Sequence, residues 1–477
     1  MTFGQQLFMT KPVHVLLADI EGDHGLRRVL GPVSLTALGV GAIIGAGIFV
    51  LTGLAANQYA GPALALSFVV SGIGCTLAAL CYAEFAAMVP VAGSAYTYAY
   101  ATLGELFAWI IGWDLVLEYA VASSTVAHGW SHYFVSFLGI FGIELPAAWI
   151  NSPFDFDPAL GHWIATGAVM NLPALLVVLA VTVVLVIGIR ESASFNAAMV
   201  ILKLVVVVFV IVVGAGYVET ANWHPYMPYG PSGVLRGAAY VFFAYIGFDS
   251  VSTHAEEARN PQRDVPIGII VSLLLCTVLY ILVAAVLTGM VPYHQIDLDA
   301  PVAQAFAVRG LPTAQLLIAL GAVVGITSVL LVLLLSQARI LLALARDGLI
   351  SRSFFGAVHP RFRTPHKATI VTGVLVALAG ALFPLKLLAD LVNIGTLMAF
   401  VIVCAAVIVM RRTNPQLYRP FRTPWMPFVP LAGIFVNLAM MFSLGWENWL
   451  RLAVWLLIGL VIYVFYGRRH SRLVTEP

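Results

Sequence analysis

Five ionisable side chains lie inside long apolar stretches of the sequence. Asp114 and Glu118 are four residues apart, so on a helix they share one face. Glu84, Lys203 and Asp249 stand in three other apolar stretches. A charge at the centre of a bilayer helix costs roughly 2.5–3.5 kcal/mol on insertion scales, and such residues mark substrate, ion or proton pathways. They predict a polar pathway inside a membrane-embedded bundle.

Each of these residues also has a structural interpretation. Glu84 could be an acid at the membrane interface, Glu118 could bond to a neighbouring helix, and Asp249 could cap the helix that follows it. Lys203 could extend its side chain to the membrane surface. The alternative for Lys203 is a buried ammonium that exchanges a proton.

Glycine is concentrated in the first apolar stretch, at positions 39, 41, 45 and 47. Each glycine weakens a helix by roughly 1 kcal/mol relative to alanine. Gly41 and Gly45 also have the spacing of close helix packing. The cluster favours an unwound segment near 43–47, because broken backbone is tolerated in a bilayer only where it lines a cavity or is buried in protein.

A second irregularity follows 202 residues later, where Gly247 stands among aromatic residues and just before Asp249. Interrupted helices at corresponding places in two halves are a pointer to the binding site of a secondary transporter. We therefore predict a second break near 244–247. The ends of the half-helices would offer N–H groups to a carboxylate and carbonyl groups to an ammonium.

The composition places these elements in a membrane. Of 477 residues, 61% are hydrophobic and only 10% are charged, which excludes an ordinary soluble enzyme, a nucleic-acid binder and a disordered chain. A spanning helix needs roughly 20 mostly apolar residues. Twelve apolar stretches are predicted to span, near 33–56, 62–88, 103–135, 171–189, 195–217, 232–256, 266–291, 313–345, 367–384, 387–410, 427–444 and 449–467.

The basic residues predict the orientation of these helices. If residues 1–31 are cytoplasmic, twelve crossings place 18 of the 24 Lys and Arg residues inside and four outside, Arg236, Arg309, Lys386 and Arg451. Cytoplasmic loops are enriched in Lys and Arg. We therefore expect a multi-pass protein of the plasma (inner) membrane, with residues 1–31 and 468–477 both in the cytoplasm. No cleavable signal is expected in residues 1–31.

Other chemistries find little support. The sequence has no Gly-Lys dipeptide for a phosphate-binding loop. His128 and His132 have helical spacing but no evident third ligand, so neither a metal nor a cofactor is expected. Cys75, Cys81, Cys276 and Cys404 are expected to be packing residues. Six tryptophans are expected at the membrane interfaces, namely Trp109, Trp113, Trp130, Trp446, Trp449 and Trp455.

Several motifs together resemble the amino acid–polyamine–organocation superfamily, and within it the bacterial permeases similar to cationic amino acid transporters. The resemblance extends from about residue 30 to 470. The motifs lie at 39–49, 82–98, 112–119, 242–249, 256–266 and 345–349.

This resemblance implies an all-α membrane protein with twelve transmembrane helices and the leucine-transporter fold. The inverted repeats would span 32–217 and 231–410, with two peripheral helices over 426–467. It implies that an α-amino acid binds between the two interrupted helices and the helices near 103–135 and 313–345. The implied substrate-binding residues are Ile43, Ile44, Gly45, Ala46, Gly47, Glu118, Phe243, Ala244, Ile246, Leu333 and Leu334.

Three further roles follow from the resemblance. Lys203 matches a lysine that replaces a sodium ion in proton-coupled relatives, which implies proton coupling. Leucine at 333 or 334 is bulky where members that accept long cations carry a small residue. This favours small neutral L-amino acids such as alanine. Glu84, Asp114, Asp249, Thr327 and Ser328 are assigned gating or structural polar roles.

The predicted function is import of amino acids by proton symport and alternating access, without enzymatic activity. Alternatives within transport are an amino acid exchanger and a transporter of arginine or lysine. An amino acid sensor without net flux and a membrane-embedded enzyme are alternatives from other classes. The expected partners are the amino acid, the proton and membrane lipid, and a small single-helix membrane subunit is a further candidate.

Overall fold

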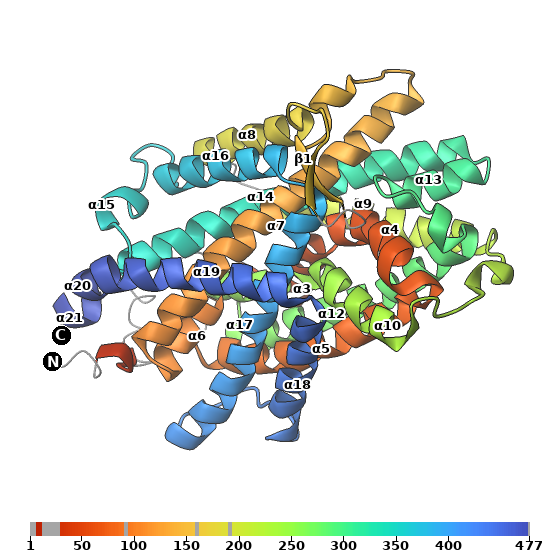
Figure 1. Cartoon of the computed structure of the whole chain (residues 1–477). Coiled ribbons are helices and arrows are strands. Elements are labelled where there is room, and N and C mark those ends of the chain that lie inside the picture. The colour runs from red at the N-terminus through yellow and green to blue at the C-terminus, as the bar shows by residue number, and fades with distance from the viewer. Residues whose placement is uncertain (1–5, 12–28, 90–93, 158–161, 189–192, 476–477) are drawn as a thin grey trace.

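The computed structural model describes residues 6–11, 29–89, 94–157, 162–188, 193–475. These residues form a bundle of helices (Figure 1). The N-terminal half contains α3 (Pro32–Ile43), α4 (Thr52–Ala55), α5 (Leu64–Met88), α6 (Ser94–Thr102), α7 (Glu105–Ile140), α8 (Leu172–Ile187) and α9 (Ala193–Ala215).

The C-terminal half continues the bundle. It contains α10 (Gly230–Val241), α11 (Ser250–Thr253), α12 (Pro261–Met290), α13 (Pro301–Val308), α14 (Pro312–Arg346), α15 (Arg352–Phe355), α16 (His366–Leu382), α17 (Leu385–Thr413), α18 (Phe428–Ser443), α19 (Trp446–Ile462), α20 (Arg468–His470) and α21 (Arg472–Thr475). Short 3-10 and π turns occupy Gly47–Leu51, Ala56–Ala60, Gly61–Ala63, Ala147–Trp149, Thr220–Trp223, Phe242–Tyr245, Ala255–Glu257, Tyr293–Gln295 and Tyr463–Gly467. In Figure 1, α17 and α18 run at a steep angle to α14 and α19.

In the described part of the chain, eight helical segments are long and apolar enough to cross a membrane. Four shorter apolar helices accompany them, Pro32–Ile43, Leu172–Ile187, His366–Leu382 and Phe428–Ser443. The apolar residues of these twelve segments point outward as well as inward. In α9, for example, Ile201, Val205 and Val212 are exposed. A helix that is apolar all round suits lipid on one side and protein on the other.

Two long helices cross the centre of the bundle. α7 packs against α14 and α17, and α12 packs against α5 and α3. Between α7 and α8, the loop folds into a small antiparallel hairpin of β1 (Phe154–Asp157) and β2 (His162–Ala165), with Asp155 opposite Ile164. The hairpin lies beside the start of α17 in Figure 1.

Three of the six tryptophans that were expected at the membrane interfaces pack between helices. Trp109 is fully buried, and its indole N–H donates to the Gly459 carbonyl at 2.8 Å. Trp113 stacks on Trp455 with ring centroids 4.5 Å apart. These rings therefore join α7 to α19, a role that indole supports equally well because it combines a large apolar face with one donor.

The two ends of the described chain meet at one end of the bundle (Figure 1). Glu105, at the start of α7, is buried and accepts hydrogen bonds from Gln6 Nε2 at 3.1 Å and from the hydroxyls of Tyr100, Tyr463 and Ser471. Burial, and then the neighbouring Glu105, raise the pKa of Tyr100, so this hydroxyl keeps its proton. A single carboxylate thus ties the N-terminal segment, α6, α7 and the C-terminal tail together.

A second acid repeats this arrangement nearby. Asp347, which follows α14, pairs with Lys11 at 3.3 Å and accepts from the Tyr96 hydroxyl at 2.6 Å. Its carbonyl accepts from the Arg472 N–H at 2.9 Å. The termini are therefore anchored to α7 and α14 by buried polar contacts on the same side of the molecule.

We expect Glu105→Ala to lower the free energy of unfolding by at least about 2 kcal/mol, because four buried donors lose one acceptor. Thermal unfolding in detergent measures the change. Glu144→Ala, in an exposed loop, is the matched control and should leave the midpoint unchanged. Equal midpoints for the two variants would show that the Glu105 contacts do not hold the termini.

Candidate functional site

The first helix is interrupted where its glycines are concentrated. α3 ends at Ile43, Ile44 adopts an extended conformation with φ −74° and ψ 101°, and the helix resumes as a π turn at Gly47. Side chains from two neighbouring helices bind carbonyls of this region. Tyr280 of α12 donates to the Ile43 carbonyl at 2.9 Å, and Lys203 of α9 donates to the Gly41 carbonyl at 2.5 Å.

The second interruption follows α10. Phe242–Tyr245 forms a 3-10 turn, and Ile246 is extended with ψ 134°. Gly247 has a φ of +114°, and a Cβ there would lie 2.9 Å from the carbonyl oxygen of Ala42. Glycine is required at this position because only glycine combines a positive φ with so close an approach to another backbone.

The two interruptions contact each other. A Cβ on Gly47 would lie 2.3 Å from the Cα of Ala244, so the backbones meet without an intervening side chain. Polar main-chain groups of both interrupted helices are thereby gathered in the core of the bundle. Such a meeting point of half-helix ends can bind a small ligand that carries both a carboxylate and an ammonium.

A small cavity lies at this meeting point. Its volume is about 10 Å³, roughly the space that one water molecule needs. Its lining consists of Ala42, Ile43, Gly45, Ala46, Gly47, Ala122, Val126, Phe243, Ile246, Val329 and Leu333. Since the lining side chains are all apolar, the main chain is the polar part of this cavity.

The structure divides the predicted binding residues into two groups. Seven line the cavity, namely Ile43, Gly45, Ala46, Gly47, Phe243, Ile246 and Leu333. Four are outside its lining, Ile44, Glu118, Ala244 and Leu334. Of the two leucines considered for the side-chain end of the cavity, it is Leu333 that faces it.

Sequence reasoning missed Ala42, Ala122, Val126 and Val329 in this lining. Small apolar residues in apolar helices carry no distinctive signal. Ala122 and Val126 are nevertheless four and eight residues after Glu118, so the helical period places them on the same face of α7. Following that face from Glu118 would have identified them.

The acids near the cavity form a buried group on the side of α7 that faces α11 and α17. The Tyr119 hydroxyl donates to Asp249 Oδ2 at 2.6 Å. The structural alternative in which Asp249 caps the following helix is wrong, because its side chain makes no capping hydrogen bond to α11. The nearby tyrosine binds the carboxylate instead.

Asp114 and Glu118 have fewer partners than Asp249. Both residues are buried. Within the described part of the chain, three of their carboxylate oxygens have no hydrogen-bond donor, namely both oxygens of Asp114 and Oε1 of Glu118. A Cβ on Gly395 of α17 would lie 2.7 Å from Asp114 Oδ1, so α17 closes over the carboxylate. An unsatisfied buried carboxylate is costly, which sets these two residues apart from acids that only hold helices together.

Lys203 is completely buried, so the alternative in which it extends to the membrane surface is wrong. Its alkyl chain passes Gly325 of α14, where an added Cβ would lie 3.2 Å from Lys203 Cγ. The ammonium donates to the Gly41 carbonyl beside the first interruption. One amine thus connects α9 and α14 to the interrupted helix.

The remaining polar candidates make local contacts. Thr327 accepts from the Trp130 indole at 2.8 Å and donates to the Val323 carbonyl, while Ser328 donates to the Gly325 carbonyl at 3.1 Å. His128 contacts the Gly380 carbonyl through Nδ1 at 3.2 Å, and His132 lies 3.1 Å from Asp299. Among the described residues, no group of three or more His, Cys, Asp or Glu side chains could hold a metal.

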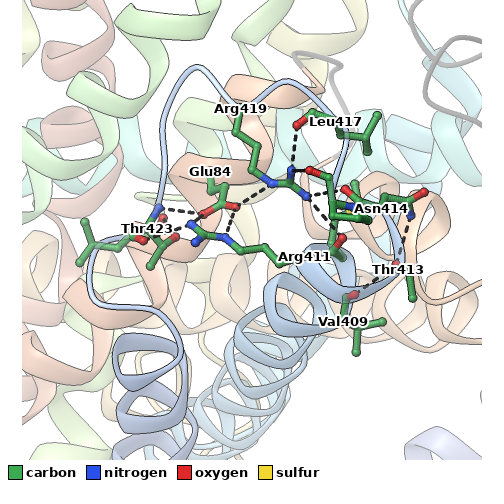
Figure 2. Close-up of polar contacts among 11 residues, drawn as sticks. Glu84, Val409, Arg411, Thr413, Asn414, Leu417, Arg419 and Thr423 are labelled. Carbon is green, nitrogen blue, oxygen red and sulfur yellow. Dashed lines mark hydrogen bonds and ion pairs between the residues drawn. The ribbon is translucent and has the colours of Figure 1, made fainter.

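Glu84 belongs to a separate charged cluster at the end of α5 (Figure 2). Its side chain is only 2% exposed, so the carboxylate is buried inside the protein. Arg411 binds both of its oxygens, at 2.9 and 2.6 Å, and Arg419 Nε approaches Oε1 to 3.4 Å. The Thr423 N–H also donates to Oε2, at 2.7 Å.

Arg419 also holds the end of α17. Its guanidinium donates to the carbonyls of Met410, Asn414, Pro415 and Leu417, as Figure 2 shows for the contacts around Asn414 and Leu417. A cation suits this position, because the last carbonyls of a helix carry partial negative charge. The cluster fastens α5 to α17 and to the segment that leads into α18, and it does not reach the cavity.

Comparison with known proteins assigns this architecture to a family. The model of the amino acid permease family matches residues 30–466. The branched-chain amino acid permease BcaP of Bacillus subtilis is 50% identical, over 98% of this chain and 99% of the relative. The methylthioribose transporter of the same organism is 45% identical, over 98% and 99%. The vacuolar cationic amino acid transporter 4 of Arabidopsis thaliana is 33% identical, over 97% and 95%.

We expect Glu84→Gln to lower the free energy of unfolding by about 3 kcal/mol, because two arginines lose their buried counter-charge while the side chain keeps its shape. Chemical or thermal unfolding of the detergent-solubilised protein measures this. Glu219→Gln is the matched control, since Glu219 pairs with Arg309 but is 58% exposed, and it should cost less than about 1 kcal/mol. Equal unfolding free energies for the two variants would show that the charged cluster does not stabilise the fold.

Proposed function

This chain belongs to the amino acid permease family, and from that membership we propose that it is a secondary transporter that imports neutral L-amino acids by proton symport. One observation carries the proposal: two interrupted helices meet at a small apolar cavity whose polar groups come from the main chain. Transport by alternating access would expose this cavity to the two sides of the membrane in turn.

We propose twelve crossings in the leucine-transporter arrangement. The eight long and four shorter apolar helices of the described residues support this number. Gly47–Met88 is divided at Gly61, where φ is +61°, and its first part is joined to Pro32–Ile43 as one interrupted helix, so the count stays at twelve. The meeting of the termini at one end of the bundle supports an even count. We propose that this end is cytoplasmic, because the loops predicted on that side are rich in Lys and Arg.

The main chain of the first interruption is the proposed carboxylate site. The N–H groups of Gly45, Ala46 and Gly47 begin the second half-helix, whose N-terminal end carries partial positive charge. The carbonyls of Ile43, Phe243, Ala244 and Ile246 end the first half-helices and are proposed to receive the ammonium. Ile44 sets the direction of the chain between these two groups.

The side-chain end of the cavity favours small neutral substrates. Ala122, Val126, Val329 and Leu333 surround it, and among the described residues no carboxylate lines it. A cationic side chain would therefore be buried without a counter-charge, which is costly. The 50% identical branched-chain permease supports an apolar substrate, and the 45% identical methylthioribose transporter makes that thio-sugar a useful competitor.

Lys203 is the proposed proton-coupling residue. In the structure its buried ammonium has one carbonyl partner, on the interrupted helix. Removal of its proton would weaken the charge-assisted hydrogen bond to the Gly41 carbonyl and make it easier for the helix to shift. Protonation would then favour one facing state over the other, as symport requires. Glu118 lies one helical turn before Ala122 on α7, and we propose that it adds a polar group next to the cavity.

The exposed apolar face of α9, with Ile201, Val205 and Val212, is proposed to contact lipid. A small single-helix subunit is the alternative occupant of this face, and co-purification of such a chain would reveal it. Neither occupant alters the proposed chemistry of the cavity.

The proposed function is tested by uptake of labelled L-alanine, L-leucine and L-arginine into proteoliposomes, with and without an inward proton gradient. We expect gradient-dependent alanine uptake in the wild type. Lys203→Ala should lose at least about 90% of the gradient-dependent rate, because the proton-carrying amine is gone. Lys367→Ala, at the start of α16, is the control and should retain it.

Each alternative gives a different result in the same assay. Uptake that needs internal amino acid but no gradient would indicate an exchanger. Arginine uptake would contradict the neutral-substrate proposal. If methylthioribose inhibited alanine uptake and unlabelled amino acids did not, the substrate class would be thio-sugars instead of amino acids. Binding of alanine without flux would indicate a sensor.

We expect Leu333→Ala to raise uptake of leucine relative to alanine by at least about tenfold, because the cavity gains room for a longer side chain. Competition between the two labelled amino acids measures the ratio. Leu334→Ala provides the control, since Leu334 is equally buried but does not line the cavity. Similar ratios for both variants would mean that Leu333 does not limit substrate size.

A further inference from the structure

A second pocket lies at the end of the bundle opposite the termini. Its volume is about 280 Å³, and it shares no lining residue with the central cavity. It is formed by the β1–β2 hairpin, the turn before α5 and the starts of α17 and α19. Its ionisable lining residues are Asp155, Lys386, Asp390, Glu447 and Arg451, and its aromatic lining residues are Tyr59, Trp163 and Trp446.

Charges of both signs converge in this pocket. Lys386 and Asp390 are one turn apart at the start of α17, so they lie on the same face. The Lys386 ammonium lies 5.7 Å from the centroid of the Tyr59 ring. On the opposite wall, Arg451 donates to Asn448 Oδ1 at 2.7 Å and lies 3.6 Å from Glu447. A molecule with one positive and one negative group would find a partner for each.

Aromatic rings form the rest of the wall. Tyr59, Trp163 and Trp446 come from three different elements, and Trp446 remains 72% exposed. An indole combines a large apolar face with one N–H donor, so it can contact both the apolar and the polar part of a small ligand. Aromatic faces also attract an ammonium group.

The pocket is connected to both interrupted helices. Tyr59 belongs to the turn Ala56–Ala60 that ends the continuation of the first interrupted helix. Its ring lies 5.3 Å from that of Tyr240 on α10, just before the second interruption. From α17, Asn393 donates to the Tyr240 carbonyl at 3.1 Å. An occupant that contacts Tyr59 and Asp390 would therefore touch the elements that must move.

We propose that this pocket is a second binding site, for a small zwitterion with a primary ammonium and an anionic group. Asp390 receives the ammonium, together with the aromatic wall, and Lys386 and Arg451 receive the anion. An amino acid on its way to the central cavity and a phosphatidylethanolamine headgroup share this chemistry. The assignment of the amino acid to this pocket rests on the proposed function.

The test compares amino acid uptake from the two sides of the membrane. Labelled alanine uptake is measured in right-side-out and inside-out vesicles for the wild type, Asp390→Asn and Lys386→Gln. We expect each variant to raise KM about tenfold on the pocket side, with maximal rates within about twofold and no change on the other side. Arg412→Gln, exposed at the other end of α17, is the matched control and should not alter KM.

Lipid composition separates the two zwitterions. The measurements are repeated in phosphatidylcholine–phosphatidylglycerol liposomes with and without phosphatidylethanolamine. If the headgroup is the occupant, removing phosphatidylethanolamine changes the wild-type KM, and the variants no longer respond. If the amino acid is the occupant, the variant effect persists without this lipid. Unchanged KM on the pocket side in both mixtures, or equal changes on both sides, would overturn the proposal.

The thermal unfolding midpoint keeps this test independent of transport. Alanine or phosphatidylethanolamine should raise the midpoint of the wild type, and both charge variants should reduce that rise while keeping the midpoint of the unliganded protein. Absence of uptake in the wild type would overturn the proposed function alone. A rise that the variants leave intact would overturn the second site.

Discussion

The requirement that every backbone group inside a membrane finds a partner governs this structure. Two helices stop inside the bundle, at Ile43 and in the turn Phe242–Tyr245, and each stop releases N–H and carbonyl groups. In hydrocarbon such groups would cost several kcal/mol each. They are tolerated because the two stops are buried against each other, where Gly47 and Gly247 allow the backbones to meet. The arrangement of the other helices follows from the need to surround this point.

Hydroxyl and amine groups of the neighbouring helices donate hydrogen bonds to main-chain carbonyls of the first interrupted helix. Tyr280 binds the Ile43 carbonyl, Lys203 binds that of Gly41, and Tyr133 binds that of Phe49. Tyr245, in the second stop, in turn binds the Phe68 carbonyl of α5. Long side chains with a terminal donor suit this task, because they reach a carbonyl while their apolar parts fill the core. The interrupted helices are thus supported by α7, α9 and α12.

The sequence predicted the features that break a local rule. Glycines in an apolar stretch indicated the interruptions, and Lys203 and the acids of α7 indicated polar groups in the core. Features that depend on distant partners were out of reach. Glu84 and Arg411 are 327 residues apart, and the sequence around either residue does not predict that the two form an ion pair. Ala122 and Val329 were not predicted for another reason. A small apolar residue in a helix gives the same sequence signal whether it lines a cavity or packs against another helix.

The buried charges fall into two classes, and the difference bears on the transport cycle. Glu84 and Glu105 each have several donors, and both lie where segments of the chain are fastened together. Moving or neutralising such a group would release many contacts at once. Lys203 has one carbonyl partner, and Asp114 has no hydrogen-bond donor among the described residues. A group with few contacts can gain or lose a proton while the rest of the structure stays assembled, because little else changes with its charge. The sparsely bonded groups of the core, rather than its best-connected carboxylates, are therefore the ones whose charge can change with the fewest broken contacts.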